Sequence, residues 1–269
     1  MFEKSFHFGL DLAASYTFGH SKSVYDGTSS VAYSNWKYNY AVDSNNPGLA
    51  YSMFDIPHRV MVSVGYRTPR YAKGFMATTV SLVYNGYVGQ RYSLTMNESY
   101  YDAEKKKTVY IDYNGDGWGG NSLLYIPTED ELQKMDFKTE EDRRKFDEWI
   151  EGDSYAKKHR GAYAMRNSNS APWENRVDLH VAQDIFVLKD RGSKFQVTFD
   201  VTNFANMLNK KWGTTYTAAY NVMPLQVIGS KKGEDGNYTN TYAYNSRNTI
   251  TKNDVLSRWH AQIGFKYIF

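Results

Sequence analysis

Apolar and polar residues alternate along Phe6–Lys22, which reads FHFGLDLAASYTFGHSK. One set of alternate positions holds Phe6, Phe8, Leu10, Leu12, Ala14, Tyr16 and Phe18, and the other holds His7, Gly9, Asp11, Ala13, Ser15, Thr17 and Gly19. A period of two predicts a strand with one apolar face and one polar face. Most strands of soluble proteins have only ~5–6 residues, whereas a transmembrane strand needs ~9–11. This segment is long enough for a transmembrane strand.

The same alternation recurs in five more segments, namely His58–Thr68, Phe75–Leu94, Arg176–Val187, Lys194–Phe204 and Arg258–Phe269. Two further segments, Thr215–Ile228 and Tyr238–Thr249, alternate less regularly, and Pro224 interrupts the first of them. The chain is therefore expected to contain about eight long antiparallel strands.

The connections between these segments differ strongly in length. Three of them are short, with the sequences PRYAKG, LKDRGS and KKGEDG. The other side of the expected sheet carries residues 23–57 and the stretch Thr95–Pro172. Short turns on one side and long loops on the other are typical of outer-membrane barrels, whose long loops are extracellular.

Composition excludes several other classes of protein. The 32 basic and 29 acidic residues give a formal net charge of +3, too small for a protein that coats nucleic acid. No stretch approaches the ~18 apolar residues of a membrane helix. The absence of cysteine excludes a disulfide scaffold and Cys-ligated metal sites. The mean hydropathy of −0.64 does not argue against membrane strands, because alternation hides their apolar face from any average.

The polar face of the first segment is lined by small residues, among them Gly9, Ala13 and Ser15. A barrel of about eight strands fills its interior with interdigitating side chains, and small residues fill such a space poorly. These strands are therefore expected to belong to a larger barrel. The chain enters a strand at once without a signal peptide, so we expect it to be the C-terminal part of a longer exported precursor.

Six stretches, spread in order over nearly the whole chain, carry a resemblance to a known family. They are DIPHRVMVSVGY at Asp55–Tyr66, SLVYNGYVGQRYS at Ser81–Ser93, DYNGDGWGGNSLLYIP at Asp112–Pro127, KKHRGAYAMRNSNSAPWENRVDLHVAQDI at Lys157–Ile185, FQVTFDVTNFANMLNKKWG at Phe195–Gly213 and SRWHAQIGFKYIF at Ser257–Phe269. The chain resembles the C-terminal barrel region of TonB-dependent outer-membrane receptors. Within that family it resembles the Oar-like branch, which carries an N-terminal carboxypeptidase-regulatory-like domain.

The resemblance implies an all-β fold in which residues 1–269 form about eight C-terminal strands of an antiparallel transmembrane β-barrel of ~22 strands. Long extracellular loops and a short loop helix would accompany the strands. It also implies location in the outer membrane, with lipid as a partner, and energised uptake of a nutrient such as a glycan, a peptide or a metal chelate. The N-terminal plug domain and the segment that contacts the TonB complex would lie outside this chain.

The last strand resembles the C-terminal signal that the barrel-assembly machinery recognises, carried here by Trp259, Ile263, Phe265, Tyr267 and Phe269. An amphipathic strand ending in an aromatic residue can add to an exposed sheet edge by β-augmentation. Trp259 and Phe269 are ten residues apart, which corresponds to roughly 25 Å along the axis of a tilted barrel. The two residues are thus expected to lie in the two aromatic girdles of the membrane.

One loop has a spacing typical of calcium sites. Asp112, Asn114 and Asp116 in DYNGDG match the first, third and fifth ligand positions of a calcium loop. Leu123 stands where such a loop needs its bidentate glutamate. A plain Asn-Gly/Asp-Gly turn explains the same residues and is the favoured interpretation. No other cofactor is expected.

The charged segment Thr128–Ile150 is expected to be helical, because TEDE and TEED both match capping boxes with Thr128 and Thr139 as caps. Tyrosines are dense in the expected loops, where they would hold sugar rings, hold peptide side chains or pack the loops together. They are Tyr33, Tyr38, Tyr40, Tyr51, Tyr100, Tyr101 and Tyr110.

No pattern points to an enzyme, because the six histidines lack metal-site spacing and no GxSxG, Walker or GxGxxG motif occurs. Nucleic acid is not expected as a partner. Two alternatives to a TonB-dependent receptor stay open at this point. One is a passive or adhesive outer-membrane β-barrel, and the other is a soluble β-sandwich that binds glycans.

Overall fold

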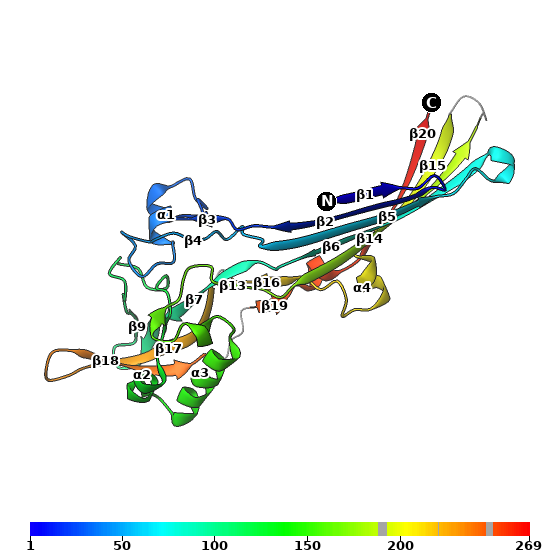
Figure 1. Ribbon diagram of the computed structural model, residues 1–269. Coiled ribbons are helices and arrows are strands. Elements are labelled where there is room, and N and C mark those ends of the chain that lie inside the picture. Colours follow the sequence, from blue (N-terminus) through cyan, green and yellow to red (C-terminus); the bar gives the residue numbers. More distant parts are fainter. Residues whose placement is uncertain (188–192, 220, 246–249) are drawn as a thin grey trace.

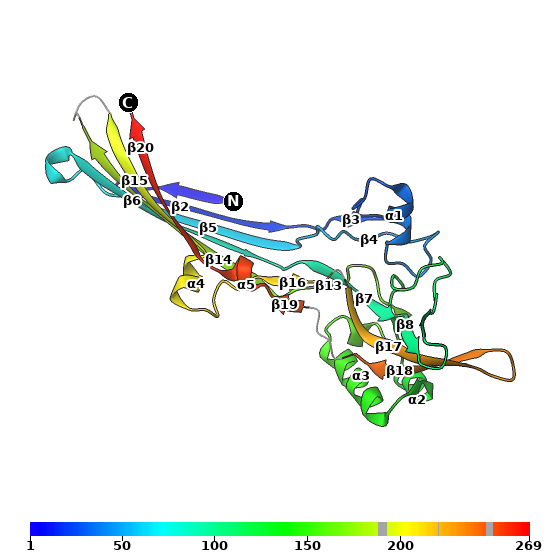
Figure 2. The same ribbon diagram turned by 180° about the vertical axis from the view of Figure 1, so that it is seen from behind.

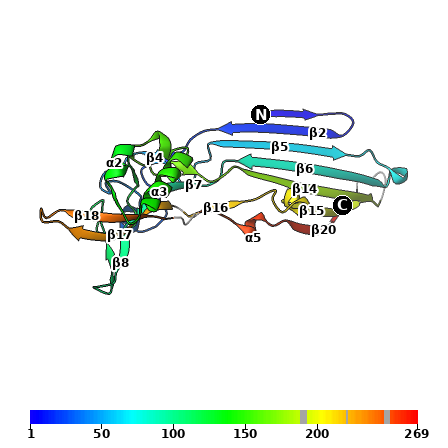
Figure 3. The same ribbon diagram turned by 90° about the horizontal axis from the view of Figure 1, so that it is seen from below.

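The computed structural model describes residues 1–187, 193–219, 221–245 and 250–269. Its main element is a seven-stranded antiparallel sheet that extends along the molecule (Figure 1, Figure 3). In spatial order the strands are β1 (Phe2–Ser5), β2 (Leu10–Phe18), β5 (His58–Arg67), β6 (Met76–Tyr87), β14 (Glu174–Phe186), β15 (Lys194–Thr202) and β20 (His260–Ile268). Each of the six segments with regular alternation contributes a strand to this sheet, in the order of the chain, but residues 6–9 form the turn before β2 and residues 88–94 lie beyond the end of β6.

The central strands are long enough to cross a membrane. β5, β6 and β14 contain 10, 12 and 13 residues. Ten residues at ~3.3 Å each and a tilt of ~40° rise about 25 Å, the height of the apolar band of an outer-membrane barrel.

β1 was not expected from the alternation. It pairs with β2 through a tight turn in which Gly9 has a φ of +95°. A Cβ atom at Gly9 would lie 2.2 Å from the carbonyl oxygen of Arg67 on the neighbouring strand, so only glycine fits this turn.

The seven-stranded sheet is open, with β1 and β20 as its two edges. The chain therefore does not close a barrel by itself within the described residues. The described residues do not show a barrel of ~22 strands, and that size stays a prediction.

The segment Phe75–Leu94 is wrong as a single strand. It divides at residues 88–90 into β6 and β7 (Arg91–Asn97), and β7 belongs to a different sheet. A Cβ atom at Gly89 would lie 2.6 Å from the carbonyl oxygen of Pro172, so the chain bends where two backbones meet closely. Alternation continues across the bend, which explains why the sequence pattern did not reveal it.

The two irregular segments are strands, but their expected place in the membrane sheet is wrong. β17 (Asn221–Lys232) and β18 (Tyr238–Tyr244) lie in a five-stranded sheet of order β11-β18-β17-β7-β13. Residue 220 of the first segment and residues 246–249 of the second lie outside the described part of the chain. The KKGEDG turn joins β17 and β18 at the end of the molecule opposite the β5–β6 turn (Figure 1), so the expected sorting of short turns fails for this one.

The remaining connections follow the expected pattern of short turns at one end of the sheet and long connections at the other. The β1–β2 and β5–β6 turns lie at one end of the seven-stranded sheet, and the described residues of the connections 19–57, 88–173 and 203–259 lie at the other (Figure 1, Figure 2). Most of the LKDRGS turn, residues 188–192, is outside the described chain. We refer to the described residues of 19–57, 88–173 and 214–252 as the loop cap.

The loop cap is a folded unit with its own hydrophobic core. Its short elements are β3 (Lys22–Ser23), α1 (Ala32–Lys37), β4 (Ala50–Tyr51), β8 (Ser99–Asp102), β9 (Lys107–Tyr110), β10 (Tyr125–Ile126), α2 (Glu129–Lys134), β11 (Asp136–Phe137), α3 (Glu140–Gly152), η2 (Ala156–Lys158), β12 (Ala162–Tyr163), β13 (Asn169–Ser170), β16 (Tyr216–Ala218) and β19 (Ile250–Lys252). Fully buried apolar side chains join several of these elements to the five-stranded sheet, among them Leu94, Leu124, Ile126, Phe146, Ile150 and Val227.

The helices expected in Thr128–Ile150 are confirmed. The Thr128 side chain accepts a hydrogen bond from the Glu131 N–H and completes a capping box at α2. Thr139 caps α3 in the same way through the Asp142 N–H. Phe146 and Ile150 point into the core of the loop cap.

Short elements accompany the seven-stranded sheet, namely η1 (Ala72–Gly74) in the β5–β6 turn, α4 (Phe204–Leu208) and α5 (Asp254–Ser257). Among the described residues, no helix has the length and apolar character needed to span a membrane.

Candidate functional site: a two-faced sheet and its loop cap

One face of the seven-stranded sheet consists of apolar side chains aligned across the strands. Leu10, Tyr66, Val80, Val181, Phe199 and Ile263 are successive cross-strand partners, and Leu12, Val64, Leu82, Leu179, Val201 and Ala261 form the next row. Many of these side chains remain open to the surroundings, with 39% of Val80 and Leu82 and 63% of Ile263 exposed. A continuous exposed apolar surface of this kind marks a contact with lipid or with another protein.

The opposite face is polar. Asp11, Gly65, Ser81, His180, Asp200 and Gln262 form one cross-strand row. His180 Nδ1 lies 2.5 Å from an Asp200 carboxylate oxygen. Because every strand keeps the same phase, apolar and charged rows do not mix, as in a barrel wall with lipid outside and an aqueous interior.

A buried carboxylate organises the charges on this polar face. Asp184 is only 2% exposed and receives hydrogen bonds from Arg67 at 2.8 Å, Lys194 at 2.7 Å and Gln196 at 2.8 Å. The donors come from two strands, Arg67 from β5 and the other two from β15, while Asp184 itself lies in β14. The cluster thus binds β5, β14 and β15 together on the polar side of the sheet.

The proposed assembly signal lies at the open edge of the sheet. Ile263, Phe265 and Tyr267 share the apolar face of β20, while Trp259 directly precedes the strand and Phe269 follows it. Tyr267 packs on Phe195 of β15 with 4.9 Å between the ring centroids. Among the described strands, β15 is the neighbour of β20. The other edge of β20 is available for pairing. Recognition of this strand by the assembly machinery stays a prediction.

The DYNGDG loop adopts a tight turn in the loop cap. Both carboxylate oxygens of Asp112 accept backbone hydrogen bonds, from Asp116 at 3.1 Å and Gly117 at 2.8 Å. Asp116 Oδ2 accepts hydrogen bonds from Ser44 and Asn121, and the Asn114 amide donates to Asn121. Across the described residues, no group of three or more His, Cys, Asp or Glu side chains is arranged to hold a metal. Calcium binding stays a prediction, and the observed contacts explain the loop as a turn.

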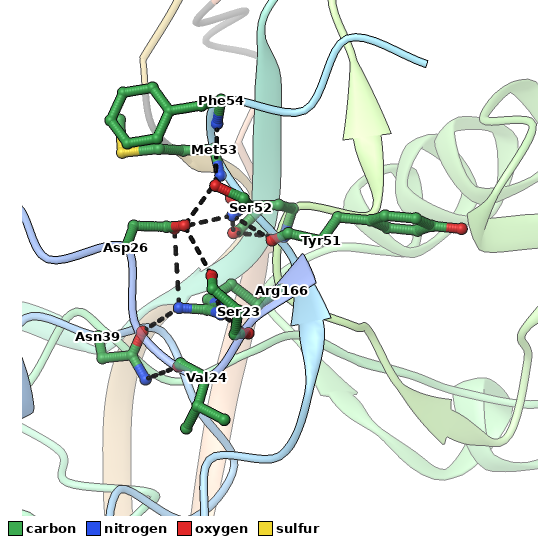
Figure 4. A network of polar contacts seen from close by, with 11 residues as sticks. Ser23, Val24, Asp26, Asn39, Tyr51, Ser52, Met53, Phe54 and Arg166 are labelled. Carbon is green, nitrogen blue, oxygen red and sulfur yellow. Dashed lines mark hydrogen bonds and ion pairs between the residues drawn. The ribbon is translucent and has the colours of Figure 1, made fainter. Parts of the chain in front are cut away.

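A buried polar network attaches the first long connection to the rest of the loop cap (Figure 4). Arg166, only 4% exposed, donates to the Asn39 side chain at 2.6 Å and to the Ser23 carbonyl at 2.5 Å. Asn167 donates to Asp26 at 3.2 Å and to the Tyr51 carbonyl at 2.8 Å. The guanidinium of Arg166 also lies 3.7 Å from Asp26.

A cavity of about 240 Å³ adjoins this network and is lined in part by Tyr38 and Tyr40, two of the tyrosines noted in the sequence. Asp26 and Arg166, the charged residues that line this cavity, pair with each other, so their role is to hold residues 19–57 in place. The sequence pattern did not indicate Asp26, Arg166 or Asn167, because about 140 residues separate the two sides of the network.

A second buried ion pair lies closer to the seven-stranded sheet. Arg91 donates to Asp55 through Nε and Nη2 at 3.1 and 2.7 Å, and its guanidinium stacks on Tyr51 at 4.3 Å. The Ser21 N–H also donates to Asp55 at 2.6 Å. Burial alone would raise the pKa of Asp55, but the hydrogen bonds from Ser21, Arg91 and His20 hold this pKa below its usual value.

This pair gives a testable prediction. Replacing Asp55 with Asn should cost about 3–5 kcal/mol of local stability, because the Arg91 charge is left buried without a counter-ion. Trypsin should then cut after Lys22 and Lys37 in the folded protein at neutral pH. The control Asp43→Asn alters a carboxylate that accepts an exposed hydrogen bond from the Asn45 N–H, and this variant should stay resistant to trypsin.

The same group predicts a pH dependence. Because the pKa of Asp55 is lower in the folded than in the unfolded chain, its stabilisation is present above pH ~4 and is lost as the pH falls through the folded pKa. The first long connection of the wild-type protein should therefore become sensitive to pepsin only in strong acid. Equal resistance of Asp55→Asn and Asp43→Asn to trypsin at neutral pH would contradict the role assigned to the ion pair of Asp55 and Arg91.

Comparison with known proteins agrees with this architecture. A family model described as an outer membrane beta barrel domain matches residues 1–248. No curated protein and no solved structure matches the chain.

Proposed function

The chain belongs to the outer membrane beta barrel domain family, and we propose that it is a segment of a TonB-dependent receptor that takes up a nutrient. Location in the outer membrane follows from the family. The finer assignment rests on the resemblance of six stretches to the C-terminal barrel region of such receptors. A soluble sandwich is excluded, because the protein resides in the outer membrane.

The observation that carries the proposal is the combination of an open two-faced sheet with a folded loop cap. Open sheet edges at membrane depth leave backbone groups without hydrogen bonds, which a bilayer does not tolerate. The edges at β1 and β20 therefore require further strands. Small and charged residues on the polar face suit the wall of a wide lumen better than the packed interior of a small barrel.

In this proposal the long connections are extracellular and capture the ligand, and a plug domain elsewhere in the precursor closes the lumen. Movement of the plug, driven by the inner-membrane complex, would release the ligand inward. Candidate ligands are a glycan, a peptide or a metal chelate. The barrel-assembly machinery would insert the protein by pairing with the free edge of β20.

An electrical measurement separates this function from a passive barrel. The protein encoded by the complete reading frame should show no steady ionic conductance in a planar lipid bilayer, because the plug fills the lumen. Uptake by cells should stop when a protonophore removes the energy supply of the inner membrane. A steady open conductance, or uptake that continues with the protonophore, would favour the passive or adhesive barrel.

A further inference from the structure

The loop cap contains a cavity of about 330 Å³ formed by residues from several of its segments. Four tyrosines line it, Tyr113 after β9, Tyr125 in β10, Tyr163 in β12 and Tyr242 in β18. The volume is in the range of small-molecule and side-chain pockets, ~300–1,000 Å³. None of these four residues is among the loop tyrosines noted in the sequence, because only the fold brings them together.

The tyrosines are held in place by contacts with one another and with polar partners. The rings of Tyr125 and Tyr163 meet edge to face with 5.1 Å between their centroids. Asn240 donates to the Tyr113 hydroxyl at 2.7 Å, and this hydroxyl lies 3.5 Å from that of Tyr242. The aromatic surfaces are thus fixed before a ligand arrives, which lowers the entropy cost of binding.

The charge on the wall of the cavity is negative. Among the described residues that line it, Glu131 is the charged one, and the others are apolar, aromatic or neutral polar. Tyr125 donates to Glu131 Oε1 at 2.9 Å, while Glu131 Oε2 completes the capping box of α2. Oε1 retains acceptor capacity, because a carboxylate oxygen has two lone pairs.

A second carboxyl lies behind the wall of the cavity. Ser122 lines the cavity, and its hydroxyl lies next to the buried carboxyl of Glu98 but outside hydrogen-bond geometry. Glu98 is 1% exposed and is not among the described residues that line the cavity, so a ligand in the cavity does not reach its carboxyl.

We propose that this cavity binds a peptide segment whose aromatic or aliphatic side chains enter between the tyrosines while a cationic group pairs with Glu131. The apolar floor, which includes Met96, Leu123 and Leu225, suits hydrophobic side chains. Tyrosine faces attract cations through their quadrupoles. An anionic ligand would meet a carboxylate and no compensating cation. This inference rests on the proposed receptor function and adds the class of ligand.

The test uses two capped tripeptides that differ only in charge, FKF and FEF, together with maltotriose as a neutral sugar. Isothermal titration calorimetry on the detergent-solubilised full chain should show that FKF binds at least tenfold more tightly than FEF, and that maltotriose does not bind. This experiment measures binding and not transport, so absence of binding would contradict the peptide ligand but not the proposal of energised uptake. Conversely, an open conductance in the bilayer would contradict energised uptake but not peptide binding in this cavity.

Matched variants of α2 identify the carboxylate responsible. Glu131→Gln removes the charge but keeps a residue that can close the capping box, and it should weaken FKF binding about tenfold while leaving FEF unchanged. Glu129→Gln makes the same change of charge in the same helical turn away from the cavity and should have no effect. Tyr163→Ala should weaken both peptides.

Three outcomes would overturn the proposal. They are equal or tighter binding of FEF, equal effects of Glu131→Gln and Glu129→Gln, and binding of maltotriose in place of the peptides. The last outcome would assign the cavity to a glycan.

Discussion

Replacing Leu82 with arginine is expected to destabilise the protein in its membrane by about 2–4 kcal/mol, the cost of a cationic side chain facing lipid at mid-depth. Leu82 lies near the middle of β6 and pairs with Val64 and Leu179 on the apolar face. With no acidic partner in these rows, the guanidinium would have to reach the interface or draw water into the bilayer. The outer-membrane fraction should contain much less folded protein.

The preceding residue provides the control. Ser81 lies on the opposite face, where its cross-strand partners are Gly65 and His180. Ser81→Arg places the same charge at the same depth but toward the polar side, and the free energy of unfolding should change by less than about 1 kcal/mol. Guanidine titration of the full-length protein in lipid vesicles measures both values. Equal losses for the two variants would show that the apolar face does not contact lipid.

The sequence was sufficient to predict six of the seven strands of the seven-stranded sheet, all but β1, because each of the six has one apolar and one polar face. A period of two follows directly from that environment and survives even where single residues deviate. Segments such as His58–Thr68 and Arg176–Val187 were therefore located nearly to the residue.

The same reasoning failed for β17, and the cause is visible in the structure. Val222, Leu225 and Val227 are buried in the loop cap, so apolar residues are not confined to alternate positions. Near Pro224 the register against β7 shifts, as expected for a residue that lacks the N–H needed for a regular ladder. The irregular pattern noted in the sequence was thus a correct signal of a different environment.

The cavity of the loop cap could not be predicted from sequence patterns for another reason. Tyr113, Tyr163 and Tyr242 belong to distant segments, and only the packing of the loop cap brings them to one cavity. The network around Arg166 depends on the same long-range contacts. By contrast, the capping boxes of α2 and α3 are local signals, and the sequence predicted both helices.

The loop cap has a core separate from the membrane sheet, which leads to the second large prediction. Phe146 of α3 is fully buried, stacks on Trp149 and contacts Phe137 of β11, with 6.1 Å between ring centroids in each case. Phe146→Ala should cost about 3–5 kcal/mol, because it removes a large buried side chain and leaves a cavity. The loss should appear in the loop cap, where trypsin would cut after Lys134, Arg143 or Arg144.

Trypsin treatment of outer-membrane vesicles compares Phe146→Ala directly with a control variant, because the protein in vesicles is cleaved only at its accessible loops. Glu148→Ala, which removes an exposed ion pair with Arg144 on the same helix, should change stability by no more than about 0.5 kcal/mol. In Phe146→Ala the strands β2, β5, β6, β14, β15 and β20 should remain protected by the bilayer while α3 is released. If this variant instead disappears from the outer membrane, the loop cap and the sheet fold as one cooperative unit, and the core of the loop cap cannot be altered independently of the barrel.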